Sequence, residues 1–292
     1  MLKNMLIDIC GSDLFSSVYD HVSMNLFSSS GDYSDVLSMI SDVSQGTVMT
    51  VALMLMLIYF CIALVDKMSS ENFTWEQMTR QMCMFFASYF LIIHGFEVLT
   101  KLFELGLSFT SEVYNVVGGG DGGSLLLVDN PGMSEEAAAE AMIEELKGDL
   151  NLADGAIISI IGDLYMFVLL LLPWIGSWIL RICVSIVCYT RIIEIYARAA
   201  FAPIAMSDFF HNGFNGAGWR FLKAFFAVCL QGALLVVIGM VYGSLVTTFV
   251  GFDAGSGTHA FTFFGKILAA GCATAMLMFK SQSICKELLG VN

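Results

Sequence analysis

The stretch Tyr189-Thr-Arg-Ile-Ile-Glu-Ile-Tyr-Ala-Arg-Ala-Ala-Phe-Ala-Pro-Ile-Ala-Met-Ser-Asp208 lies between two long apolar spans. It belongs to a basic segment that holds five of the chain's 13 Lys and Arg residues: Arg181, Arg191, Arg198, Arg220 and Lys223. Lys and Arg in short loops stay on the cytoplasmic side of a membrane. This concentration of positive charge therefore predicts which side of the membrane each neighbouring loop occupies.

The composition indicates a membrane protein. Hydrophobic residues make up 57% of the 292 residues and charged residues only 13%, which is about half the charged share of a soluble domain. The net charge of −13 comes mainly from acidic residues outside the apolar spans. It does not indicate a cationic partner, and the chain has no basic patch of the kind that binds nucleic acid.

Five segments are long and apolar enough to cross a bilayer, whose core of roughly 30 Å needs about 20 helical residues. The third is too long for one upright helix. It is either one tilted, kinked helix that continues into the cytosol or two segments broken at Leu172-Pro173. The sequence therefore predicts an all-α polytopic bundle of about five transmembrane helices, at residues 46–65, 82–99, 156–190, 224–250 and 260–279.

The distribution of Lys and Arg predicts an outside N-terminus and an inside C-terminus. On this layout an extracytoplasmic amphipathic segment occupies residues 1–45, and the first two spans lie in 46–99. An extracytoplasmic acidic loop and helix follow in 100–155. The last three spans lie in 156–292, with a cytoplasmic basic elbow at 191–223.

Two further patterns predict helices outside the spans. Leu6, Cys10, Leu14, Val18 and Val22 recur every four residues, which is typical of an amphipathic helix lying on the outer membrane face or against the bundle. Short helices are also expected at 35–43 and 134–147, and an interfacial helix from residue 219.

No motif indicates catalysis, a cofactor or a metal site. The eight cysteines include no CxxC pair, and the four histidines include no HExxH. The Gly-rich run at 117–124 lacks the Lys-Ser/Thr of a phosphate-binding loop. The sequence therefore predicts a protein that is not an enzyme and binds no cofactor or metal.

Charged residues within the spans are the candidate functional residues, because each is costly to insert into lipid. Asp163 either lines an aqueous path or pairs with a neighbouring helix, and Arg181 can reach the cytoplasmic interface. Arg191, Glu194 and Arg198 are spaced to form one strip on a helix. Glu194 and Arg198 have the order that favours a pair within the helix, as have Glu97 and Lys101.

The strip has several interpretations. A self-contained pair is the simplest, and phospholipid headgroups are a further partner for Arg191. A cytoplasmic contact or a salt bridge between subunits is the functional alternative. Together with two charged residues of the third predicted span, the strip gives five candidates for path lining or subunit contact: Asp163, Arg181, Arg191, Glu194 and Arg198.

Turn and packing residues complete the candidate set. Pro203 predicts a bend, and Gly213 and Gly216 predict a turn before the next helix. Small residues four apart allow close approach of helices, either within the chain or between subunits. These small residues are Gly239 and Gly243 in one span, and Gly271 and Ala275 in another.

The quoted stretch, its Gly/Asn turn and Trp219-Arg-Phe-Leu-Lys-Ala-Phe-Phe-Ala-Val-Cys-Leu-Gln-Gly232 carry a family resemblance. They resemble the TrbL-like polytopic membrane subunits of conjugative type IV secretion systems, closest to those on mobile elements of Gram-positive bacteria. The specific match covers residues 181–241, and elsewhere only the layout agrees.

The resemblance implies a homo-oligomeric channel or scaffold component in the bacterial cell membrane. Such a component helps relaxase-bound single-stranded DNA to cross, and its partners are other secretion subunits, ATPases and membrane phospholipids. No small-molecule substrate is implied. Two other hypotheses stay open: an ion-coupled or small-solute transporter with Glu97, Asp163 and Arg181 in a relay, and a purely structural scaffold.

Overall fold

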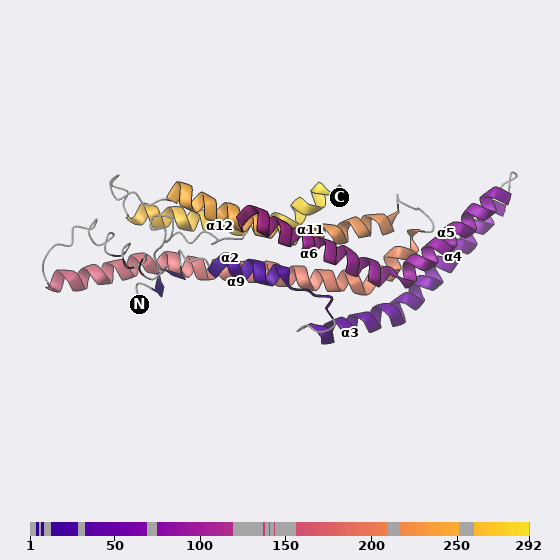
Figure 1. The fold of residues 1–292 in the computed structure, drawn as a ribbon, viewed down its shortest axis with the longest axis horizontal. Coiled ribbons are helices and arrows are strands. Elements are labelled where there is room, and N and C mark those ends of the chain that lie inside the picture. The colour runs from indigo at the N-terminus through magenta and orange to yellow at the C-terminus, as the bar shows by residue number, and fades with distance from the viewer. Residues whose placement is uncertain are drawn as a thin grey trace. The chain divides into compact units, whose positions relative to one another are not determined.

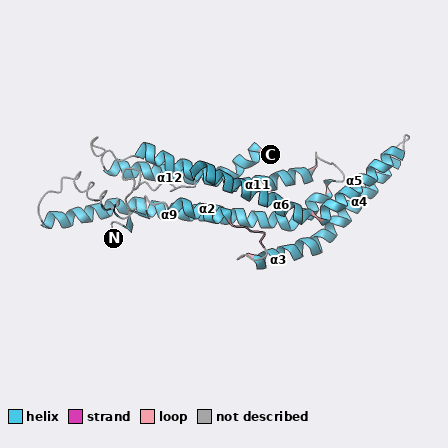
Figure 2. Ribbon diagram, in the orientation of Figure 1, coloured by secondary structure: helices cyan, strands magenta, loops and turns pink. Residues whose placement is uncertain are grey.

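The computed structural model describes residues 4–5, 7–8, 13–28, 33–68, 75–118, 137, 140, 143, 156–209, 216–250 and 260–291. Within these ranges nearly every residue is helical and no strand occurs (Figure 2). This confirms the predicted all-α class. Its physical basis is that a helix satisfies its own backbone hydrogen bonds where lipid offers none.

The helices that the structure describes are named by their labels in Figure 1. The predicted short helix at 35–43 is confirmed as α3, whereas most of 134–147 lies outside the described residues. The helices are α2 (Asp13–Ser23), α3 (Ser34–Val43), the π-helical turn η1 (Ser44–Val48), α4 (Met49–Met68), α5 (Trp75–Ile93), α6 (Gly95–Gly118), α9 (Ala156–Ser207), α11 (Ala217–Val250) and α12 (Ala260–Leu288).

Four stretches of described helix are long and apolar enough to cross a membrane: Ser34–Asp66, Leu170–Ser207, Ala217–Tyr242 and Gly265–Leu288. A fifth crossing results if the bent pair Met78–Ile93 and Gly95–Val116 is counted as one span. The described helices therefore give four or five candidate spans, in agreement with the prediction of about five.

Helix continues in the structure beyond the predicted second span at 82–99. The chain bends by 66° at a break between α5 and α6, and α6 then continues as helix to Gly118. The sequence analysis assigned residues 100–118 to the acidic loop and helix of 100–155. A helix with charges on one side only still packs through its other side.

The third predicted span is a single helix, α9, of 52 residues, about 78 Å long at 1.5 Å per residue. It passes through Pro173 without ending, so the two-segment alternative is wrong. It also continues past Pro203 to Ser207. The chain therefore does not leave the helix at Pro203, where the sequence predicted a redirecting bend.

The chain forms two compact units, each with its own core. The first comprises Met1–Ser23, Thr110–Cys188 and Ala233–Ser281. The second comprises Met24–Phe109, Tyr189–Gly232 and Gln282–Asn292. Four helices (α6, α9, α11 and α12) contribute residues to both units.

In the first unit, α2 packs against the bundle. Val18 and Val22 are buried in a cluster with α9, α11 and α12 residues, and Tyr19 stacks on Tyr114 of α6 at 3.8 Å between ring centroids. The sequence predicted that this amphipathic helix lies either on the outer membrane face or against the bundle. In the structure it lies against the bundle. The other members of the cluster are Val184, Val187, Cys188, Leu235, Val236, Ile238 and Met278.

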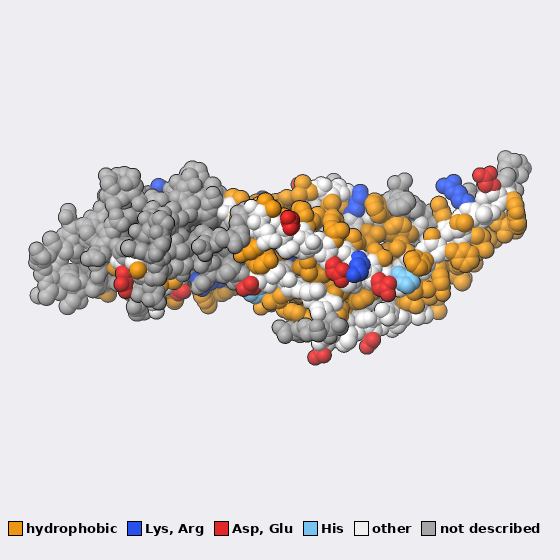
Figure 3. All heavy atoms as spheres, in the orientation of Figure 1, with side chains coloured by type: hydrophobic (Ala, Val, Ile, Leu, Met, Phe, Trp, Pro, Cys, Tyr) orange, Lys and Arg blue, Asp and Glu red, His pale blue; other side chains and the backbone are white. Residues whose placement is uncertain are grey.

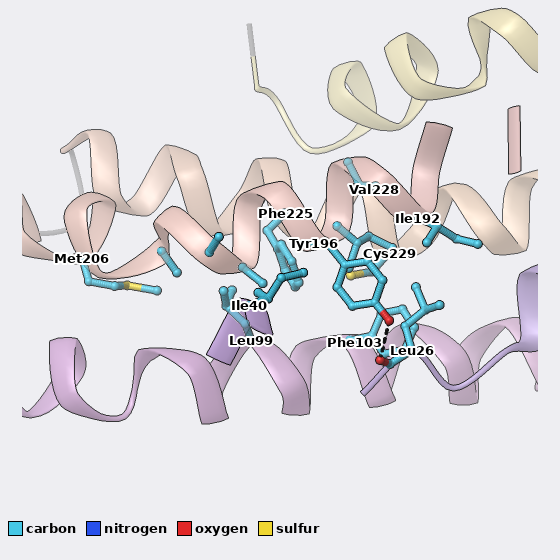
Figure 4. Packing of buried hydrophobic residues seen from close by; sticks show 14 of the residues in the cluster. Leu26, Ile40, Leu99, Phe103, Ile192, Tyr196, Met206, Phe225, Val228 and Cys229 are labelled. Atoms are coloured by element: carbon cyan, nitrogen blue, oxygen red, sulfur yellow. Dashed lines mark hydrogen bonds between the residues drawn. The ribbon is translucent and has the colours of Figure 1, made fainter. Parts of the chain in front are cut away.

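In the second unit, α6 faces both α9 and α11 (Figure 4). Leu99 and Phe103 of α6 are almost completely buried, and burial of such side chains stabilises by about 1.5–3 kcal/mol each. Across from them lie Tyr196 of α9 and Phe225 of α11. The Tyr196 hydroxyl donates to the carbonyl of Leu26 at 2.8 Å, which fixes the segment between α2 and α3.

The contacts of two glycines set the direction of α6. A Cβ on Gly95 would lie 3.6 Å from Cγ of Met206, and one on Gly106 would lie 2.8 Å from Cβ of Cys229. Gly95 thus lies at the end of α9, where a Cβ on Gly218 of α11 would also contact the carbonyl of Ala205. Gly106, further along α6, meets Cys229, which is further along α11. Helix α6 therefore runs parallel to α11 and antiparallel to α9.

The α4–α5 hairpin is also joined to the end of α9 within the second unit. Its two helices lie side by side (Figure 1), with Phe60 and Phe85 at 4.7 Å between ring centroids. At its base, the buried Ser44 hydroxyl in η1 donates to the carbonyl of Ala199 at 3.4 Å. This contact joins η1 to the part of α9 that the sequence analysis assigned to the basic elbow at 191–223. Charge counting alone contains no information about such a contact.

We predict that Gly106→Ala destabilises the protein by about 1–3 kcal/mol, because the added methyl group forces α6 away from Cys229. The unfolding midpoint of the protein in detergent measures the effect. Gly265→Ala in α12 is the matched control, since nothing lies within 4 Å of the position of its Cβ. An unchanged midpoint for Gly106→Ala would contradict the close approach of α6 and α11.

Candidate functional site

The charged strip of α9 lies in the second unit, and its first member points into the protein. Arg191 is only 3% exposed. Its Nε donates to the carbonyl of Val228 at 3.1 Å, and its Nη2 donates to the carbonyl of Cys229 at 3.2 Å. Both carbonyls belong to α11, whose own hydrogen bonds use one lone pair of each oxygen. The guanidinium uses the remaining capacity and joins α9 to α11.

The burial of Arg191 decides between its predicted partners. A buried cation is costly unless hydrogen bonds compensate for lost water, and bonds from a guanidinium are stronger than neutral ones. The two carbonyls supply that compensation inside the chain. Arg191 therefore does not reach phospholipid headgroups.

Glu194 and Arg198 form the predicted pair within the helix. The Glu194 Oε1 accepts from Arg198 Nη2 at 2.5 Å and from Nε at 3.1 Å. Its other oxygen, Oε2, accepts a bond from the side-chain amide of Gln282 in α12. Both carboxylate oxygens are thus engaged, so the strip connects α9 to α11 through Arg191 and to α12 through Glu194. Sequence reasoning missed Gln282, because nothing in the sequence relates it to residue 194.

Arg181 lies in the first unit and contacts the N-terminal segment. Its Nη2 donates to the backbone carbonyl of Asp8 at 3.0 Å and lies 3.8 Å from Oδ1 of the same residue. The Asp8 Oδ2 accepts from the indole Nε1 of Trp174 at 3.0 Å. The sequence suggested that Arg181 reaches the membrane interface, and the structure gives it a partner 173 residues away.

The turn between α9 and α11 depends on a residue that the sequence analysis did not identify. The carboxylate of Asp208 accepts from the backbone N–H of Ala217 at 2.5 Å and of Gly218 at 3.4 Å. An acidic side chain bonded to the first N–H groups of a helix is a typical N-terminal cap. Gly216 is buried at this turn, and its carbonyl accepts from the N–H of Arg220 at 3.3 Å. The other predicted turn residue, Gly213, lies outside the described residues.

The small residues of the spans make contacts inside the first unit. A Cβ on Gly271 would lie 3.5 Å from Cδ2 of Leu180 and 3.8 Å from the hydroxyl of Tyr242. Gly239 is buried and Ala275 is half-buried. Close approach at Gly271 is therefore used within the chain. Gly243 lies in α11, and its surroundings are outside the described part.

Two remaining candidates complete the comparison with the sequence. Asp163 lies in α9, but its side chain is not among those that the structure describes, so its role stays a prediction. The predicted pair of Glu97 and Lys101 is wrong. Glu97 instead pairs with Nδ1 of His94 at 2.9 Å, and Lys101 pairs with Glu104 at 2.7 Å.

The described residues include no group of three His, Cys, Asp or Glu side chains that could hold a metal ion. Arg191 contacts α11, and Glu194 contacts both Arg198 of α9 and Gln282 of α12. The polar contacts of the charged strip therefore hold α9, α11 and α12 together in an apolar protein.

We predict that Arg191→Lys destabilises the protein more than Arg191→Met does. Lysine keeps a buried charge but lacks the fork that reaches both carbonyls, which removes about 1.5–3 kcal/mol of hydrogen bonding. Methionine also loses the bonds but removes the cost of burying the charge. Unfolding midpoints in detergent test this order.

Arg220→Lys is the control for that comparison, because Arg220 is exposed at the start of α11. Its midpoint should equal that of the wild type. An Arg191→Lys variant as stable as the wild type would show that the two carbonyl contacts contribute nothing.

Comparisons with known proteins place the chain in a family. The family model described as "TrbL/VirB6 plasmid conjugal transfer like protein" matches residues 21–203, which is well over half of the chain. The match includes the quoted stretch as far as Pro203 and ends before the Trp219–Gly232 segment. No curated protein matches the chain, and no solved structure matches it.

Proposed function

Because this chain belongs to the TrbL/VirB6 plasmid conjugal transfer like family, we propose that it is a channel component of a conjugative type IV secretion system. In this role it helps relaxase-bound single-stranded DNA to cross the bacterial cell membrane, as a homo-oligomer and without enzymatic activity of its own. The family match over residues 21–203 is the single observation that carries the proposal.

The helices support a position in the membrane. Four described stretches, and a bent fifth, have the length and apolarity of spans. Large apolar side chains are exposed along α4 and α9, among them Leu57, Ile62, Trp178 and Ile182. Exposed apolar surface of this extent is expected where lipid, rather than water, surrounds a protein.

The orientation is part of the proposal and follows from the basic residues. We place the loop between α9 and α11 on the cytoplasmic side, because Arg198, Arg220 and Lys223 flank it. The Ser44–Ala199 contact then brings the base of the α4–α5 hairpin to that same side. Helix α6 leads away from this side in parallel with α11, and the acidic residues that follow α6 lie outside.

This proposed orientation differs from the predicted layout, which placed residues 1–45 outside, because it brings the residues around Ser44 to the cytoplasmic side. In it, α6 is a crossing by itself, rather than half of a bent span, and alternates in direction with α9, α11 and α12. The α4–α5 hairpin begins and ends at the cytoplasmic side. The C-terminus stays inside, as the sequence predicted. The proposed partners are further copies of the chain, other secretion subunits and the ATPases that supply energy.

Deletion of the gene tests the proposed function directly. We expect DNA transfer from the deletion strain to be lost and to return when the wild-type gene is supplied in trans. A second arm supplies Gly265→Ala, which changes an open position in α12 and should restore transfer equally well. Normal transfer without the gene would overturn the proposal, and ion-dependent solute uptake by purified protein in vesicles would favour a transporter instead.

Chemical cross-linking in intact membranes tests the homo-oligomer. We expect a ladder of cross-linked species that contain only this chain, because the proposed channel is enclosed by several copies. Purified protein of one defined mass should retain the same species. A strictly monomeric protein in both preparations would contradict the oligomeric channel.

A further inference from the structure

Helix α6 presents an exposed polar face along most of its length. Polar residues recur three or four positions apart, so they fall within about 100° of the helix circumference. Glu97 and Lys101 have side chains that are 76% and 77% exposed. We call this surface the polar face of α6, and its members are Glu97, Lys101, Glu104, Ser108, Glu112 and Asn115.

The opposite face of α6 is buried in the bundle. Leu99, Phe103 and Gly106 face the second unit's core. Gly106 meets Cys229, which lies inside the uncharged stretch 224–250 of α11. From this point onward the polar face runs beside a part of α11 that is apolar enough to lie in lipid.

A third face of α6 is apolar and exposed. Leu105, Phe109 and Val116 are each more than half exposed, and they lie next to the polar face on the helix. Neighbouring residues at the same depth along the helix therefore lie on different faces. Ser108 and Asn115 lie on the polar face, and Phe109 and Val116 lie on the apolar face. A helix wholly in bulk water would not need this separation of polar and apolar residues.

Lipid cannot be the neighbour of the polar face. A charged side chain in the middle of a bilayer costs about 2.5–3.5 kcal/mol on insertion scales. The surface in Figure 3 shows acidic and basic side chains gathered over α6, beside apolar ones. Water or a polar partner must therefore cover this face when α6 lies beside the spans.

We propose that the polar face of α6 lines a water-filled passage enclosed by several copies of this chain, with Leu105, Phe109 and Val116 turned toward lipid. The inference rests on the proposed function and assigns a helix to the lining of the channel. Charged residues on a spanning helix are accommodated where they face an aqueous cavity.

The charges of this face suit the passage of a polyanion. Three carboxylates stand against one lysine, and that lysine is paired with Glu104. Binding to a nucleic-acid backbone requires cations that neutralise phosphates. A wall of paired and acidic residues does not retain such a backbone, and it therefore allows single-stranded DNA to move on.

Single cysteines on α6 test the proposal in intact membranes. The background replaces Cys10, the half-buried Cys183 and the exposed Cys61, Cys83 and Cys272 by alanine, and it keeps the buried Cys188, Cys229 and Cys285. Ser108→Cys and Asn115→Cys report on the polar face, and Phe109→Cys and Val116→Cys are the matched controls at the same depth. Each is treated with a small, charged thiosulfonate and, separately, with a polyethylene-glycol maleimide too large for a narrow passage.

We expect the small reagent to label the two polar-face cysteines on the order of tenfold faster than the two controls, because only a thiolate in water reacts readily. The large reagent should label none of the four. Equal slow labelling at all positions would overturn the proposal, because the polar face would then be dry. Equally fast labelling by the large reagent would also overturn it, because the face would then lie in bulk water.

The same strains are scored for DNA transfer, which separates this inference from the proposed function. If DNA transfer requires the gene but the polar-face cysteines are not labelled, only the proposal that α6 lines the passage is rejected. If the deletion strain transfers DNA normally, the proposed function is rejected, whatever the labelling pattern.

Discussion

The second unit depends on how one buried cation is satisfied. Arg191 cannot be hydrated where it lies, so the structure provides two carbonyls of α11 as acceptors. Because these acceptors are backbone atoms inside a helix, they hold α9 and α11 at a fixed separation and register. Glu194 then extends the polar contact to α12 through Gln282. The rest of that core, including Tyr196 and Phe225, packs around this framework.

The same constraint explains the other charges of the apolar helices. Arg181 finds its acceptor in the N-terminal segment, at Asp8, which also bonds to Trp174. The charged residues of α6 are accommodated differently. Glu97 and Lys101 pair with residues three positions away, and the charged side chains lie on one exposed side of the helix. Inward charges thus organise the bundle, and outward charges require water. For a protein that belongs to a conjugal transfer family, the second group is the natural place to look for a path.

Local patterns in the sequence were sufficient for the class, the number of spans, helix α3 and the Glu194–Arg198 pair. Each follows from residues close together in the chain: an apolar run of span length, or opposite charges four apart. The failures have a common cause. The sequence analysis missed contacts between residues far apart in the chain, and no local period encodes such contacts. Gln282 lies 88 residues from Glu194, Arg181 lies 173 residues from Asp8, and Ala199 lies 155 residues from Ser44. Glu97 and Lys101 lie on one side of α6, which continues to Gly118, beyond the predicted second span at 82–99.

An electron cryo-microscopy map of the protein extracted with its native lipids tests the central claim, that inward charges are bonded within the chain and outward charges face water. We predict a ring of copies in which α6 turns Ser108 and Glu112 toward a central aqueous volume. In the same map, Arg191 should contact α11 of its own copy. A map in which lipid covers the polar face of α6, or in which Arg191 points into the central volume, would contradict the account.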